Sequence, residues 1–147
     1  MNETEYCEFG RKVIATEIEA IQNLYNNIDD SFAEACKLLL NCNGRVIVTG
    51  MGKSGHIGHK IAATLASTGT PAFFVHPGEA SHGDIGMITK QDVVICLFPV
   101  PSTNEIITLL PVIKRLGIPF ITITGNHNST LAQQVPGKYQ DYLPFQG

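Results

Sequence analysis

Four short apolar runs alternate with stretches of helical periodicity, and this alternation restricts the chain to very few folds. The runs cover residues 46–48, 72–75, 93–96 and 118–123. They are continuously apolar rather than apolar at every second position, which indicates strands that are buried on both faces. Strands that alternate with helices form parallel sheets. The sequence therefore predicts a three-layer α/β fold, in which helices cover both faces of a parallel sheet.

Composition and charge exclude several classes of protein. The 147 residues are enough for one domain, and 44% hydrophobic residues with 16% charged ones exclude a disordered protein. The net charge of −3 argues against a general nucleic-acid binder. No apolar run approaches the roughly 18–20 residues that span a bilayer. Because the N-terminus is acidic where a signal peptide would be basic, we expect a cytoplasmic protein without nucleic-acid or membrane partners.

Residues 1–44 have the pattern of two helices. The apolar residues of the first recur at steps of four and three, which places them on one helix face: Ile14, Ile18, Ile21, Tyr25 and Ile28. Asp29, Asp30 and Ser31 are candidate N-caps for the second helix, which turn residues end at 41–44. The four cysteines show no CxxC or CxxH spacing, so we expect buried thiols rather than metal ligands or disulfides: Cys7, Cys36, Cys42 and Cys96.

A glycine-rich loop, Gly50-Met51-Gly52-Lys53-Ser54-Gly55, joins the first predicted strand to a helix. Its glycine spacing matches the dinucleotide-binding fingerprint, but Val75 and His76 stand where that fold carries an acidic residue. Glycines let a ligand approach the backbone, and the amides of a helix N-terminus favour an anion such as phosphate. The loop therefore predicts a phosphate site with Gly52, Lys53 and Ser54. The alternative is a tight turn that binds nothing.

The segment VIVTGMGKSGHIGHKIAATLASTGTPAFFVHPGEASHGDIGMIT closely resembles the sugar isomerase (SIS) domain of D-arabinose 5-phosphate isomerases. The resemblance runs from about residue 17 to 134. It implies a flavodoxin-like sheet, a homo-oligomer with composite active sites and no required cofactor. The implied reaction interconverts D-arabinose 5-phosphate and D-ribulose 5-phosphate, which supplies the lipopolysaccharide sugar Kdo. We expect N-terminal helices (1–44) that pack against a neighbouring subunit, a SIS core (45–134) and a tail unlike the family (135–147).

Aldose–ketose isomerisation moves a proton between adjacent carbons through an enediol, so it needs a base and groups that stabilise an oxyanion. The resemblance implies that Lys53 stabilises the oxyanion and that Glu105 is catalytic, with Glu105 as our candidate base. Glu105 follows the third strand, at the carboxyl edge where α/β sheets bind ligands. Its alternative role is to complement the dipole of the helix that it opens.

Further substrate contacts follow from the same resemblance. It implies that His76 and His82 face the substrate and that His76 can also take zinc, while Gly69 and Thr70 match a substrate-contacting pair. The six-residue spacing of the two histidines is less typical of a metal site than a spacing of three or four. Their alternative role is to cap backbone carbonyls in the loop between them.

Two segments depart from the family. Relatives follow the third strand with a serine-rich phosphate loop, whereas residues 97–103 read Leu-Phe-Pro-Val-Pro-Ser-Thr. Two prolines remove amide donors, and only Ser102 and Thr103 keep hydroxyls for substrate. The tail also lacks counterparts of a second catalytic glutamate and a later histidine. Both departures have the sharp borders of a reading-frame change, and we expect a weak or inactive isomerase.

Two other function classes remain open on the sequence. SIS domains of transcription regulators bind sugar phosphates without catalysis, although no helix-turn-helix with a basic recognition helix precedes this SIS segment. The second class is a nicotinamide-dependent oxidoreductase, and only the glycine fingerprint supports that interpretation.

Overall fold

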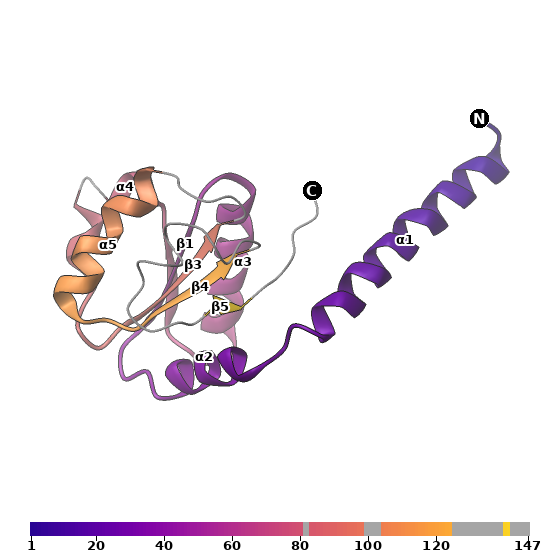
Figure 1. Cartoon of the computed structure of the whole chain (residues 1–147). Helices are drawn as coiled ribbons and strands as arrows, with labels where there is room; N and C mark the ends of the chain where they lie inside the picture. Colours follow the sequence, from indigo (N-terminus) through magenta and orange to yellow (C-terminus); the bar gives the residue numbers. More distant parts are fainter. Residues whose placement is uncertain (81–82, 99–103, 125–139, 142–147) are drawn as a thin grey trace.

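The computed structural model describes residues 1–80, 83–98, 104–124 and 140–141 (Figure 1). At its centre lies a parallel sheet with the strand order β2-β1-β3-β4-β5. This is the flavodoxin-like order, and it confirms the predicted parallel α/β fold. The strands are β1 (Val46–Gly50), β2 (Ala72–Val75), β3 (Val93–Phe98), β4 (Phe120–Thr124) and β5 (Gln140–Asp141).

Helices cover both faces of the sheet. The helical elements are α1 (Glu3–Tyr25), α2 (Asp30–Leu40), α3 (Gly52–Ser67), α4 (Pro77–Ala80), the 3₁₀ turn η1 (Asp84–Met87) and α5 (Asn104–Leu116). Ile47 of β1 packs with Leu109 and Ile113 of α5 on one face. Val46 and Val48 pack on the other face, in a cluster with residues of α2 and α3. Because neighbouring residues of β1 point to opposite cores, the strand is apolar at every one of these positions, as its sequence indicates.

At the amino edge of the sheet, the buried carboxylate of Asp92 links neighbouring segments of the backbone. Asp92 is 1% exposed, and it accepts hydrogen bonds from the backbone N–H groups of Arg45 at 2.8 Å and Thr89 at 2.7 Å. The Arg45 guanidinium lies 3.5 Å from the same carboxylate and also donates to the Met87 carbonyl. Burial alone would raise the pKa of Asp92, but these hydrogen bonds and the Arg45 charge hold the pKa below its ordinary value.

Two sequence-based expectations are wrong in detail, and one element was not expected. Within the tail (135–147), whose departure from the family stays a prediction, residues 140–141 form β5, which pairs with β4 through Thr122–Gln140 and Ile123–Asp141. The first helix ends at Tyr25, so Ile28 lies beyond it. Only Cys96 is fully buried, which raises the pKa of its thiol, whereas Cys7 is exposed and Cys36 and Cys42 are half-buried. Cys7 is exposed because α1 has no buried residue.

No helix in the described part of the chain is long and apolar enough to cross a membrane.

Candidate functional site

The candidate site lies at the carboxyl edge of the sheet, where β1 passes into α3. Met51, with an extended backbone, is the N-cap of α3, and it makes no side-chain capping hydrogen bond. Gly52 follows with φ +56°, a left-handed backbone that favours glycine. In the first turn, Lys53 is exposed to solvent and Ser54 is 8% exposed. The helix therefore begins with backbone donors, a hydroxyl and a cation that suit an anionic ligand.

Two glycines of this loop have a packing role. A Cβ on Gly50 would lie 2.9 Å from the Leu97 carbonyl oxygen in β3, and a Cβ on Gly55 would lie 2.8 Å from the Gly50 carbonyl oxygen. Both positions thus exclude any side chain, because the two strands and the helix approach one another too closely. This packing accounts for the first and last glycines of the fingerprint without a dinucleotide.

His76 follows β2 at the same edge. The pairing of Thr49 with Val75 sets the ends of β1 and β2 side by side, so His76 lies next to the strand that leads into the glycine loop. His76 is exposed, and its Nδ1 accepts a hydrogen bond from the Gly78 N–H at 3.1 Å. In the neutral ring the proton is therefore on Nε2, which can donate to an oxygen of a ligand.

The arrangement around His76 does not fit a zinc site. The described residues contain no group of three or more histidine, cysteine, aspartate or glutamate side chains that could hold a metal. Nδ1 of His76 already accepts a hydrogen bond from the Gly78 N–H. His82 lies outside the described residues. Zinc at His76 is therefore not supported by the described residues.

The loop that follows β3 is outside the described part of the chain. Ser102 and Thr103 lie in it. Glu105 is the second residue of α5, and its side chain is also outside the described part. Because α5 follows β3, the backbone of Glu105 belongs to the same edge of the sheet as the glycine loop.

Gly69 and Thr70 lie at the opposite edge. They follow the C-terminal end of α3, which precedes β2, and β2 runs parallel to β1. A helix of 16 residues is about 24 Å long, so α3 separates them from Lys53. Within one chain the structure brings Lys53, Ser54 and His76 to one edge and leaves Gly69 and Thr70 at the other.

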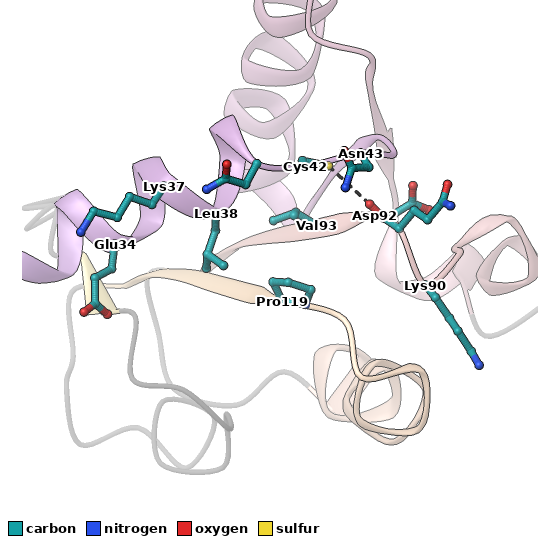
Figure 2. A pocket seen from close by; sticks show the side chains of 11 residues that line it. Glu34, Lys37, Leu38, Cys42, Asn43, Lys90, Asp92, Val93 and Pro119 are labelled. Atoms are coloured by element: carbon teal, nitrogen blue, oxygen red, sulfur yellow. Dashed lines mark hydrogen bonds between the residues drawn. The ribbon is translucent and has the colours of Figure 1, made fainter.

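Sequence reasoning missed two polar features. The Thr49 side chain is 1% exposed, and its Oγ1 has no hydrogen-bond partner among the residues that the structure describes. A pocket of about 490 Å³ lies at the amino edge of the sheet, between α2 and the starts of β3 and β4 (Figure 2). Its lining includes Lys37, Cys42 and Asp92. No motif in the sequence marks this pocket, because residues distant in sequence form it.

The comparisons with known proteins agree with this fold. The SIS domain family matches residues 39–136. The arabinose 5-phosphate isomerase KdsD of Pseudomonas aeruginosa is 59% identical over 136 residues, which are 90% of this chain and 42% of that protein. A solved structure from Escherichia coli CFT073, in complex with arabinose 5-phosphate, has a TM-score of 0.89 at 40% identity, covering 98% of this chain and 76% of that one.

A more distant likeness concerns the fold alone. The Vibrio vulnificus NanR protein complexed with ManNAc-6P has a TM-score of 0.76 at 18% identity, covering 97% of this chain and 54% of that one. The chain spans about two fifths of the length of the curated relatives that it matches.

Proposed function

The chain belongs to the SIS domain family, and from that premise we propose that it is a phosphosugar isomerase domain of the arabinose 5-phosphate type. Its reaction would interconvert D-arabinose 5-phosphate and D-ribulose 5-phosphate, in the cytoplasm, as a step in the supply of lipopolysaccharide sugar. The observation that carries the proposal is the meeting of Lys53, Ser54 and His76 at the carboxyl edge of the sheet. The 59% identity to an arabinose 5-phosphate isomerase supports the choice of substrate.

Each group at this edge has a role in enediol chemistry. The first-turn amides of α3 and the Ser54 hydroxyl would bind the phosphate, since a helix N-terminus favours an anion. Glu105 would remove the proton from C1 of the ketose and return it to C2, while the proton of the O1 hydroxyl passes to O2 in the enediol intermediate. Lys53 would stabilise the negative charge that develops on the oxygen, and Nε2 of His76 would donate to a sugar oxygen. This sequence of steps uses no redox cofactor and no metal.

Gly69 and Thr70 fit this proposal only in an assembly. Because α3 separates them from Lys53 of the same chain, they would contact substrate bound at a neighbouring copy. The site would then be composite, and the active species would be a homo-oligomer.

We further propose that catalysis by this chain is weak. The segment 97–101 replaces hydroxyl and amide donors with apolar side chains and two prolines. A hydrogen bond to a charged group contributes about 1.5–3 kcal/mol, so the loss of two such bonds weakens binding by roughly a hundredfold or more. The same segment favours a second candidate function, a module that binds sugar phosphate without converting it.

Hydrogen exchange separates the two candidate functions. The purified chain is incubated with D-ribulose 5-phosphate in D₂O, and deuterium at C1 and C2 is followed by NMR. An isomerase incorporates deuterium and forms D-arabinose 5-phosphate, whereas a binding module does neither. Lys53→Ala should abolish the incorporation, and Lys60→Ala, which removes another exposed lysine of α3, should leave it unchanged. An incorporation that survives in Lys53→Ala would reject the assignment of Lys53.

A further inference from the structure

The sequence contains one Asn-Gly pair, Asn43-Gly44, which lies in the turn between α2 and β1. Asn-Gly is common in tight turns, because both residues tolerate backbone angles that most residues avoid. The turn is at the amino edge of the sheet, on the side opposite to Lys53 and His76. The isomerase mechanism uses neither residue of the pair, so its chemistry is separate from the proposed function.

An exposed asparagine is chemically labile, because the backbone nitrogen of the next residue can attack its side chain. The nitrogen forms a bond to Cγ, the bond from Cγ to Nδ2 breaks, and ammonia leaves with the proton of the attacking N–H. The product is a cyclic succinimide. Water then opens the ring at either carbonyl group and gives aspartate or isoaspartate, in which the main chain runs through the side-chain carbon. The reaction needs no redox partner, but it needs an exposed amide and a backbone nitrogen that is free to attack.

Asn43 has both features. Its side chain is exposed, and it makes no hydrogen bond or ion pair with the residues that the structure describes. It lines the pocket at the amino edge, where Figure 2 draws it. The N–H of Gly44 has no acceptor in the described part of the chain, and glycine has no side chain to shield its nitrogen. The Asn43 amide is therefore open to water, and the neighbouring nitrogen is free to attack it.

The other asparagines that lie in turns of the described chain differ at this nitrogen. In each case the N–H of the next residue donates to a carbonyl one turn earlier, at 2.9–3.5 Å. These asparagines are Asn26, Asn27 and Asn41, and the acceptors are Leu24, Tyr25 and Leu39 respectively. A nitrogen held by such a bond cannot turn toward the preceding side chain without breaking the bond. The hydrogen bonds therefore single out Asn43.

We propose that Asn43 is a site of spontaneous modification, at which the folded chain forms a succinimide and then aspartate and isoaspartate. The modification replaces a neutral amide by a carboxylate on the lining of the amino-edge pocket. The chain, which has a net charge of −3, becomes more acidic by one charge.

Isoaspartate should also disturb the structure, because Gly44 is packed tightly. A Cβ on Gly44 would lie 2.5 Å from Oδ1 of Asp92 and 2.6 Å from the Gln91 carbonyl oxygen. The next N–H, that of Arg45, donates to the same Oδ1 at 2.8 Å. Isoaspartate adds a carbon atom to the main chain between residues 43 and 44, so it displaces Gly44 and weakens this hydrogen bond. The aspartate product leaves the main chain unchanged and should leave the bond intact.

Peptide mass spectrometry of the whole chain, incubated in the folded state in mildly alkaline buffer, tests the site. We expect the peptide that holds residues 41–43 to show the mass of an amide converted to a carboxyl group, with fragment ions that place the change at Asn43 and leave Asn41 intact. Asn43→Gln keeps an amide but lengthens the side chain, so the attack becomes unfavourable and the mass change should be lost. Asn41→Gln makes the same substitution in the same turn, and the conversion at Asn43 should continue at its original rate.

Urea denaturation of the chromatographically separated products tests the structural consequence. The isoaspartate form should unfold at a lower urea concentration than the original chain, whereas Asn43→Asp, which reproduces the aspartate form, should unfold at the original concentration. The proposal is overturned if Asn43 keeps its amide in the folded chain, if it converts only in the urea-unfolded chain, if Asn41 converts as fast, or if the isoaspartate form unfolds with the original chain. None of these readouts depends on isomerase activity, so the result is independent of the proposed function.

Discussion

A Cβ on Gly55 would lie 2.8 Å from the carbonyl oxygen of Gly50. The first turn of α3 therefore rests directly on the end of β1, and this contact sets the direction in which the helix presents its first amides. Gly52, between them, has the positive φ that starts the helix.

Gly55→Ala should lower the free energy of unfolding by about 1–3 kcal/mol, because the methyl group forces the helix away from the strand. Urea denaturation followed by circular dichroism measures the change. Gly86→Ala is the control, since no heavy atom lies within 4 Å of its Cβ position. We expect the control to change stability by less than about 0.5 kcal/mol. Equal effects of the two variants would contradict the close contact.

Thr49→Val should stabilise the chain by about 1–2 kcal/mol. The Thr49 hydroxyl is buried and has no hydrogen-bond partner among the described residues, so its replacement by a methyl group removes a desolvation cost. Val48→Thr is the matched reverse change in the same strand, and it should destabilise the chain by a similar amount. Thermal unfolding of the two variants tests the pair, and a destabilised Thr49→Val would show that the hydroxyl is satisfied.

Because of Asp92, the free energy of unfolding should fall as the pH is lowered into the acid range. Its folded-state pKa lies below the unfolded value, so its contribution is present above about pH 4 and is lost as the pH falls through the folded pKa. Asp92→Asn should therefore cost about 2–3 kcal/mol at neutral pH and show a weaker loss of stability between about pH 5 and 3. The urea concentration at the unfolding midpoint, measured across this pH range, tests the prediction. If the midpoint falls with pH as steeply in Asp92→Asn as in the original chain, the role of Asp92 is refuted.

Much of the fold was predictable because local pattern and burial agree. β2 has the bounds of its apolar run, and Asp29 caps α2 as its sequence predicts, through a hydrogen bond to the Ser31 N–H. β5 was not predictable, because Gln140 and Asp141 carry no apolar strand pattern and are strand only through their pairing with β4.

The candidate site was predictable in part. The glycine loop and His76 reach one edge because strand ends in a parallel sheet meet there. Gly69 and Thr70 lie at the other edge. The family resemblance did not reveal this, because a match in sequence does not show whether a residue contacts substrate bound to its own chain or to a neighbouring copy. His59 packs on Phe74, with ring centroids 3.8 Å apart, and this contact had no signal in the sequence.

The central claim is that the carboxyl edge binds a sugar phosphate, and an NMR titration of the chain with D-ribulose 5-phosphate tests it most directly. We predict saturable shifts of the backbone amides of residues 52–55 and of the His76 ring, and none at residues 41–43, which line the pocket at the opposite edge. Lys53→Ala should weaken the binding, and Lys60→Ala should not. Shifts confined to residues 41–43, or no shift at residues 52–55 at saturating ligand, would contradict the account.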